Sequence, residues 1–160
     1  LENYNVTGEH IKSGITKIKS TARLQKIKKG KLKNLSKRNI LIVDGSHNPL
    51  GASVIKKYLE NQMTHKKIYI ITGMMNNKNH KEYISFFKNI AQSISVIDIP
   101  NQKNAIKKEK LKSIIDKIGI LCFTEKSVQN AIKTISKKEQ NCLILITGSL
   151  YLAGEILNLN

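Results

Sequence analysis

Apolar runs of strand length alternate along the chain with segments in which apolar residues recur at helical spacing. The runs are rich in Ile, Leu and Val, and several are almost continuously apolar, which indicates strands that are buried on both faces. The expected strands are residues 24–27, 40–44, 67–72, 95–99, 119–124 and 142–147. The expected helices are residues 51–62, 81–93, 108–117 and 126–139.

This order of elements predicts an α/β fold. Strand–helix–strand units are right-handed and place their helices on the faces of a parallel sheet. We therefore expect a three-layer Rossmann-like domain, with a mostly parallel six-stranded sheet, one antiparallel edge strand and helices on both faces. The edge strand is residues 24–27, because no clear helical pattern separates it from the next strand. The basic segment 28–38 is expected to join the two as an exposed excursion.

Three loops are expected to carry the chemistry. In open α/β sheets, ligands bind outside the carboxyl ends of the strands, where loops lead into helices. That rule selects residues 44–49 (DGSHNP), 73–79 (GMMNNKN) and 148–151 (GSLY).

The first of these loops combines an acid, an imidazole and the start of a helix. Asp44 ends a buried strand, and His47 precedes a helix whose free N–H groups attract anions. The loop therefore suits a polar ligand. In the alternative interpretation, Asp44 and Asn48 merely cap the turn and the helix, and His47 is an exposed bystander. Spacing alone does not decide between the two.

Two further residues are candidates for anion binding. Ser149 follows the last strand, where its hydroxyl can hold a carboxylate or phosphate, although a plain helix cap explains the same position. Arg23 has a planar guanidinium that grips phosphate or carboxylate, although it can equally be a surface charge on an edge strand. Helical spacing assigns four residues to the core: Tyr151, Leu152, Ile156 and Leu157. The remaining histidines are expected to be exposed: His10, His65 and His80.

The charge and composition exclude several classes of function. The net charge of +17 invites a nucleic-acid interpretation, but 26 of the 28 basic residues are Lys and only 5% of residues are aromatic. Lys, Ile and Asn, all with AT-rich codons, make up 67 of the 160 residues, so codon bias explains the charge equally well. We therefore expect no nucleic-acid partner.

Membrane, metal and dinucleotide sites are also not expected. No apolar run approaches the roughly 18 to 20 residues that a membrane span needs. The chain has no GxxxxGK[ST] phosphate loop, no GxGxxG fingerprint and no metal-ligand cluster. Cys122 and Cys142 lie in apolar runs without metal-ligand spacing, which predicts buried thiols in a reducing, cytoplasmic compartment.

Four sequence blocks in order carry a family resemblance. They are ARLQ at 22–25, LIVDGSHNP at 41–49, TGMMNNK at 72–78 and TGSLYLAGE at 147–155. Together they closely resemble the C-terminal domain of the folylpolyglutamate synthase and dihydrofolate synthase family, within the Mur ligase superfamily. The resemblance covers about residues 20 to 157.

The resemblance implies an ATP-dependent ligase that joins dihydropteroate or a folate to the amine of L-glutamate through an acyl phosphate. In that family the phosphate loop and the Mg²⁺ ligands lie in preceding domains, and the C-terminal domain is a lid. By this resemblance Arg23 contacts the ATP phosphates and the reacting centre, and Asp44 contacts the nucleotide. His47 and Ser149 help to hold the glutamate. Arg23 and His47 are thus the catalytic candidates, and this chain supplies no metal ligand.

The resemblance also sets expectations for the organisation of the chain. Residues 1–20 are expected to be the tail of a missing central domain and a hinge, and residues 21–160 the ligase C-terminal domain, acting as a monomer. The chain departs from the family in the residues before Arg23 and at Asn79, where an Asp is common. Alone, it is expected to be inactive. The alternatives are a stand-alone Rossmann-like nucleotide- or anion-binding module and a remnant of a split ligase gene.

Overall fold

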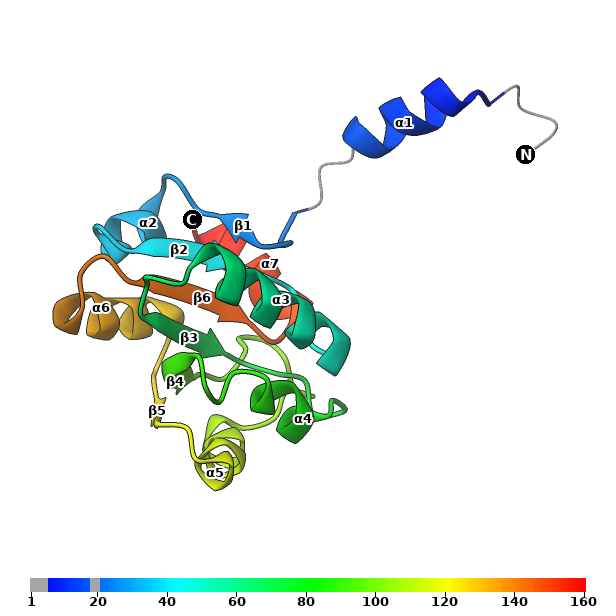
Figure 1. Ribbon diagram of the computed structural model, residues 1–160. Coiled ribbons are helices and arrows are strands. Elements are labelled where there is room, and N and C mark those ends of the chain that lie inside the picture. Colours follow the sequence, from blue (N-terminus) through cyan, green and yellow to red (C-terminus); the bar gives the residue numbers. More distant parts are fainter. Residues whose placement is uncertain (1–5, 18–20) are drawn as a thin grey trace.

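A six-stranded sheet forms the centre of the domain in the computed structural model, which describes residues 6–17 and 21–160 (Figure 1). The strand order is β1-β2-β6-β3-β4-β5. The strands are β1 (Gln25–Lys26), β2 (Ile40–Val43), β3 (Ile68–Thr72), β4 (Ala91–Val96), β5 (Cys122–Thr124) and β6 (Leu143–Thr147). Only the β1–β2 pair is antiparallel, whereas the four other pairs are parallel. The predicted sheet, with its antiparallel edge strand, is confirmed.

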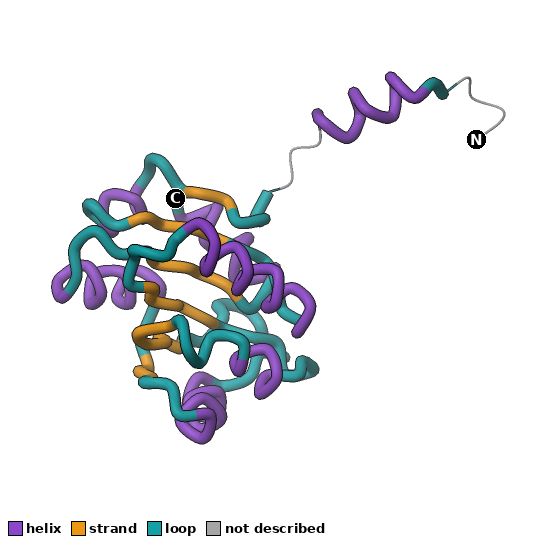
Figure 2. The backbone as a smooth tube through the Cα atoms, in the orientation of Figure 1, coloured by secondary structure: helices purple, strands orange, loops and turns teal. Residues whose placement is uncertain are grey.

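Helices cover both faces of the sheet (Figure 2). Buried residues of α3 (Pro49–Gln62), α4 (His80–Ser85) and α5 (Lys108–Ile118) join one core cluster. Those of α2 (Lys31–Ser36), α6 (Val128–Lys138) and α7 (Leu150–Leu159) join a second cluster on the other face. The predicted three layers are therefore confirmed. An additional helix, α1 (Gly8–Lys17), lies apart from the sheet (Figure 1).

The central strand β6 explains the continuous apolar runs. All five of its residues are buried, with Leu143 and Leu145 in the first cluster and Ile144 and Ile146 in the second. Successive side chains of a strand point to opposite faces, so a strand that is covered on both faces needs apolar residues throughout.

The prediction for residues 81–99 was partly wrong. The helix there ends at Ser85 instead of Ser93, and β4 spans Ala91–Val96 instead of residues 95–99. The strand register is set by pairing with β3, which places Ile70 beside Ile94. Ile97 and Ile99 follow the strand but are still buried in the second cluster, so their apolarity mimicked a later strand.

Two other expectations need correction. The segment 28–38 is not simply an exposed excursion, because Lys31–Ser36 form α2 and Leu32 is buried against the second cluster. β5 starts at Cys122 and not at residue 119, since Gly119 ends α5 in the left-handed region with φ 84°.

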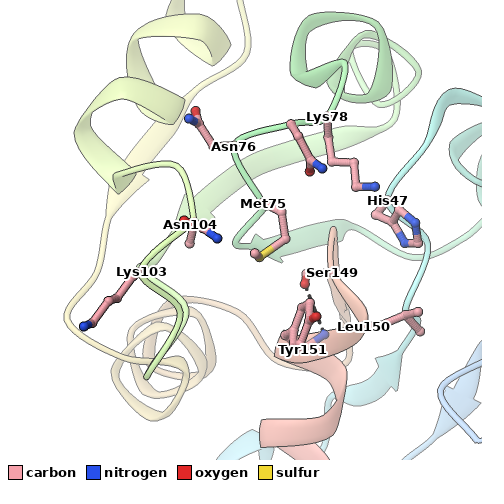
Figure 3. Close-up of a pocket in the computed structure, with 11 residues that line it drawn as sticks. His47, Met75, Asn76, Lys78, Lys103, Asn104, Ser149, Leu150 and Tyr151 are labelled. Atoms are coloured by element: carbon pink, nitrogen blue, oxygen red, sulfur yellow. Dashed lines mark hydrogen bonds between the residues drawn. The ribbon is translucent and has the colours of Figure 1, made fainter.

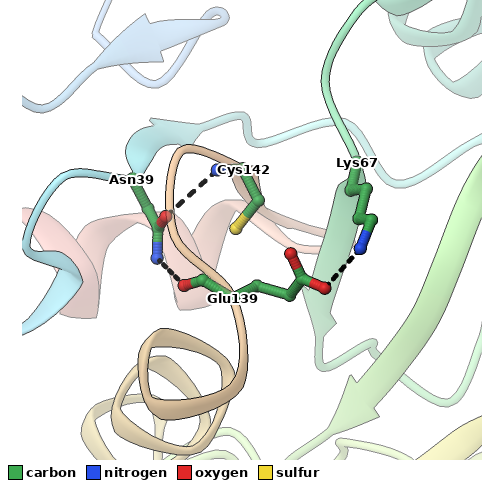
Figure 4. Close-up of polar contacts among 4 residues, drawn as sticks. All are labelled: Asn39, Lys67, Glu139 and Cys142. Carbon is green, nitrogen blue, oxygen red and sulfur yellow. Dashed lines mark hydrogen bonds and ion pairs between the residues drawn. The ribbon is translucent and has the colours of Figure 1, made fainter.

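The buried side-chain amide of Asn39 connects the amino ends of the strands, at the edge of the sheet opposite the predicted site. Asn39 Nδ2 donates to the Glu139 carbonyl at 3.2 Å, and Asn39 Oδ1 accepts from the backbone N–H of Cys142 at 3.1 Å (Figure 4). The Glu139 carboxylate also pairs with Lys67 at the start of β3. The polar contacts therefore join the beginnings of β2, β3 and β6 to the end of α6.

Both cysteines are buried free thiols, as predicted, with 5% of Cys122 and 1% of Cys142 exposed. Burial raises the pKa of both thiols, to about 12 for Cys122 and about 11 for Cys142. Across residues 6–17 and 21–160, the structure has no helix long and apolar enough to cross a bilayer.

Candidate functional site

Two adjoining pockets lie at the carboxyl ends of the parallel strands. The first, of about 630 Å³, lies among the loops that follow β2, β3, β4 and β6 (Figure 3). The second, of about 420 Å³, lies between the turn that precedes β1, the start of α3 and Leu150. His47 and Leu150 line both pockets. The pockets therefore lie at the edge of the sheet that the strand-end rule selects.

Asp44 is a structural anchor of the second pocket. The residue is 3% exposed, and its two carboxylate oxygens accept different backbone N–H groups. Oδ2 accepts from Leu24 at 2.7 Å, and Oδ1 accepts from Ser46 at 2.8 Å. The capping interpretation of Asp44 is therefore observed, while each oxygen keeps a further acceptor position for a ligand.

Arg23 is exposed on a tight turn that Asp44 holds. Its neighbours Ala22 and Leu24 have φ 54° and 44°, in the left-handed region that non-glycine residues seldom adopt. The Gly45 N–H donates to the Ala22 carbonyl at 2.8 Å, so both sides of the turn are tied to the β2 loop. The turn presents Arg23 at the wall of the second pocket.

His47 lies on the boundary between the pockets and is partly buried, which argues against an exposed bystander. Its Nδ1 lies 3.0 Å from the carbonyl oxygen of Gly45. Because a carbonyl only accepts, Nδ1 carries the proton, and Nε2 of the neutral ring is an acceptor. Asn48 caps α3 as expected, since its Oδ1 accepts from the Gly51 N–H at 2.8 Å.

Ser149 caps α7 and lines the first pocket. Its Oγ accepts from the Tyr151 N–H at 3.1 Å, and the residue is 2% exposed (Figure 3). The capping interpretation is therefore observed, and the hydroxyl hydrogen is still available to a ligand. Leu152 and Ile156 belong to the core as predicted, and Leu157 packs partly buried against it. The prediction was wrong for Tyr151, which is 56% exposed and lines the pocket.

Sequence reasoning missed part of the first pocket. Lys103 and Asn104 line it from the loop after β4, and Lys78 lines it with its side chain directed toward His47 (Figure 3). The strand-end rule covers the first two residues as well, because their loop also follows the expected strand 95–99. That loop was not among the three selected, whereas Lys78 lies in the selected loop 73–79. His80 is also not simply exposed, because its Nε2 lies 2.9 Å from the Met75 carbonyl and braces the same loop.

The pockets divide the predicted residues into two sets. Arg23, Asp44 and His47 line the second pocket, whereas His47 and Ser149 line the first. The first pocket has basic and amide side chains, and no acidic residue lines it within the part of the chain that the structure describes. This arrangement suits an anionic ligand beside an acceptor nitrogen.

The donor set does not suit a Mg²⁺ ion. Mg²⁺ binds carboxylate oxygens and water, and among the described residues Asp44 is the single carboxylate that lines either pocket. No group of three or more His, Cys, Asp or Glu side chains that could hold a metal ion occurs in residues 6–17 and 21–160.

Comparison with known proteins decides the family. Residues 25–159 match the family described as dihydrofolate synthetase, C-terminal domain. The chain belongs to this family. The dihydrofolate synthetase C-terminal domain therefore accounts for nearly all of the chain, including β1 to α7.

Two curated relatives agree with this assignment. The dihydrofolate synthase/folylpolyglutamate synthase of Bacillus subtilis (strain 168) is 23% identical over 95% of this chain and 33% of its own length. The folylpolyglutamate synthase of Lacticaseibacillus casei is 24% identical over 94% of this chain and 32% of its own length. The chain therefore spans about a third of the length of these relatives.

Solved structures share the fold. Mycobacterium tuberculosis folylpolyglutamate synthase complexed with ADP and AMPPCP aligns with a TM-score of 0.80 at 19% identity, over 97% of this chain and 35% of that chain. The bifunctional Yersinia pestis enzyme complexed with AMPPNP and a Mn ion aligns with a TM-score of 0.73 at 14% identity, over 96% and 34%. Both of these proteins with the same fold were solved with adenine nucleotides or their analogues, and the second also with a Mn ion.

Proposed function

We propose that this domain forms one side of the active site of an ATP-dependent ligase that joins L-glutamate to dihydropteroate or a folate. The family match over residues 25–159 carries the proposal. The two-pocket geometry supports it, because a ligase of this kind must bring a nucleotide, a carboxylate substrate and an amine together at one point.

The second pocket is the proposed nucleotide side. Its apolar wall includes Leu24, Leu50 and Val54, which suit a flat base, and Arg23 supplies a fixed positive charge for phosphates. Arg23 is proposed to stabilise charge on the phosphoryl group as the acyl phosphate forms. Asp44 is proposed to contact the nucleotide through its free acceptor positions while it holds the Arg23 turn.

The first pocket is the proposed glutamate side. The Ser149 hydroxyl and the basic residues of the pocket suit the carboxylates of glutamate. The acceptor nitrogen Nε2 of His47 is proposed to orient the attacking amine and to receive a proton from it as phosphate leaves. His47 is suited to this part because it belongs to both pockets.

The rest of the machinery is proposed to come from a partner domain. We place the phosphate loop and the Mg²⁺ ligands there, residues 1–20 as the connection to it, and the whole in the cytoplasm as a monomer. Mg²⁺ would supply charge neutralisation on the transferring phosphoryl group. No step that we assign to this chain depends on it.

A chimeric enzyme tests the proposed function. The C-terminal third of the Bacillus subtilis relative is replaced by this chain, and ATP-dependent incorporation of labelled glutamate into dihydropteroate or a folate is measured. We expect the chimera to ligate glutamate and the 160-residue chain alone to be inactive. His47→Ala in the chimera should lower kcat/KM at least tenfold.

The matched control is His65→Ala, since His65 is exposed and lies outside both pockets. It should leave ligation unchanged. Ligation by the isolated chain would contradict a shared active site. A chimera that folds and binds ATP but ligates no glutamate would contradict the proposed reaction.

A further inference from the structure

We propose that Tyr83, a residue of α4 that lies outside all the sequence motifs, is a positioning residue that sets the orientation of His47. The inference rests on the function proposed above for His47. Its geometric basis is a buried hydroxyl that reaches from α4 to the loop before His47.

The Tyr83 hydroxyl contacts the loop after β2 and the end of β6. It lies 3.0 Å from the Ser46 carbonyl oxygen and 2.8 Å from Thr147 Oγ1. Each hydroxyl has one hydrogen, and the Thr147 hydroxyl is 3.4 Å from the same carbonyl. The shorter distances favour donation from Tyr83 to Ser46 and from Thr147 to Tyr83. In either arrangement, the Ser46 carbonyl accepts a buried O–H group.

The Ser46 carbonyl belongs to the peptide that leads into His47. The Gly148 N–H also donates to this oxygen, at 3.0 Å, and the Ser46 N–H donates to Asp44 Oδ1. Both polar groups of the Ser46 backbone are therefore held, the N–H by Asp44 within the loop and the carbonyl from outside it. Fixing the peptide fixes the direction of the next side chain, and with it the Nδ1 contact of His47 to the Gly45 carbonyl.

Tyr83 is itself fixed firmly enough to act as a reference point. It is fully buried, and its ring packs edge-on against Phe87 with 5.5 Å between centroids. Burial raises the pKa of its hydroxyl well above the ordinary value. The hydrogen bond with Thr147 opposes this rise in pKa, and the Asp44 carboxylate adds to it. The hydroxyl therefore keeps its proton at physiological pH and remains a donor.

The position of α4 also connects Tyr83 to the loop after β3, residues 73–79. α4 begins directly after residues 73–79, and Asn79 caps it by accepting from the Glu82 N–H at 3.3 Å. A displacement of that loop would move Tyr83 and, through it, Ser46. Tyr83 thus links the β3 loop to the loops after β2 and β6.

NMR of the 160-residue chain tests the positioning role without requiring catalysis. Tyr83→Phe removes only the hydroxyl, and the double variant Tyr83→Phe and Thr147→Val also removes the second O–H group near the Ser46 carbonyl. We expect the His47 ring to lose its preference for a proton on Nδ1 in both variants. The ring ¹⁵N shifts report which tautomer is present. The Gly148 amide should exchange at least tenfold faster, because its acceptor is no longer anchored.

Tyr58→Phe is the matched control. Tyr58 is a half-buried tyrosine of α3 that packs against the first core cluster and lines neither pocket. It should change neither the His47 tautomer nor Gly148 exchange. A wild-type tautomer and wild-type exchange in both Tyr83→Phe and the double variant would overturn the proposal, whatever reaction the domain serves.

The chimera supplies the catalytic readout. Tyr83→Phe should lower kcat/KM for glutamate at least fivefold and leave the KM for ATP within twofold, because the Arg23 turn is held by Asp44 and not by Tyr83. Equal losses toward both substrates would indicate a general loss of folding and overturn the specific link to His47.

Discussion

The Asp44 carboxylate ties the Arg23 turn to the loop that carries His47. It accepts the Leu24 and Ser46 N–H groups, so one buried side chain holds residues from two segments of the sequence. A carboxylate serves here because both of its oxygens accept and neither donates.

Replacing Asp44 with Asn should therefore destabilise the domain. The amide presents an N–H₂ group to one of the two backbone donors, which is then buried without an acceptor. We expect a loss of about 1–3 kcal/mol in the free energy of unfolding, measured by urea denaturation. Asp116→Asn is the control, because Asp116 is exposed and pairs with Lys112 four residues earlier. A loss no larger than that of the control would contradict the anchoring role.

At this scale the sequence predicted some of the residues that line the pockets but not their hydrogen-bond partners. The pattern DGSHNP placed Asp44 and His47 at a strand end, and both line the second pocket. That Asp44 binds the Leu24 N–H depends on a turn 20 residues earlier, with two non-glycine residues at positive φ, and no local pattern encodes this. Tyr83 was equally hidden, because a buried tyrosine in a helix has the same sequence signal as any core residue.

The loops after β2 and β6 approach each other closely at Gly148. This residue has φ 112°, and a Cβ at its position would lie 2.3 Å from Thr72 Oγ1. Its N–H meanwhile donates to the Ser46 carbonyl. Only glycine satisfies both the backbone conformation and the contact with β3.

Gly148→Ala should thus distort the junction between the two loops. We expect a destabilisation of about 1–3 kcal/mol from the backbone strain, with the contact to Thr72 adding to it. Gly154→Ala is the matched control, because Gly154 is exposed within α7 and a Cβ there meets nothing within 4 Å. That control should stabilise the domain by about 0.5–1 kcal/mol. Thermal and urea unfolding of the two variants would separate the effects, and equal stabilities would argue against strain at Gly148.

The elements themselves were predictable wherever burial gave the sequence a clear apolar pattern. β2, β3 and β6 are buried on both faces, and their apolar runs located them almost to the residue. β4 was misplaced because Ser93 and Ser95 are buried within it, whereas the isoleucines that follow it lie outside the strand. Small buried polar residues give a strand no apolar signal, so tertiary pairing alone fixes its position.

The molecule as a whole combines a strongly basic surface with a core that holds two protonated thiols. Cys122 lies in the first core cluster and Cys142 in the second, so each layer contains one. Their ordinary pKa is 9.0, and burial raises it to about 12 and about 11. The pKa of each thiol is higher in the folded chain than in the unfolded chain. Folding therefore becomes less favourable once the unfolded chain begins to lose its thiol protons.

Stability should for this reason fall as the pH rises from about 9 to about 11. In that range the unfolded chain releases thiol protons that the folded chain retains, so raising the pH favours unfolding. Urea denaturation at a series of pH values measures the slope. The double variant Cys122→Ala and Cys142→Ala should show a shallower slope, although its absolute stability is lower. An unchanged slope would assign the alkaline loss to other groups.

The ties between the site loops have a thermodynamic consequence for binding. Ser46, Gly148, Thr147 and Tyr83 are joined by hydrogen bonds within the domain itself, so the entropy of ordering these loops is lost when the chain folds. A ligand or a facing domain then meets a surface that is already arranged. Its association should show a heat-capacity change that matches the apolar area it covers, with no additional contribution from a folding loop.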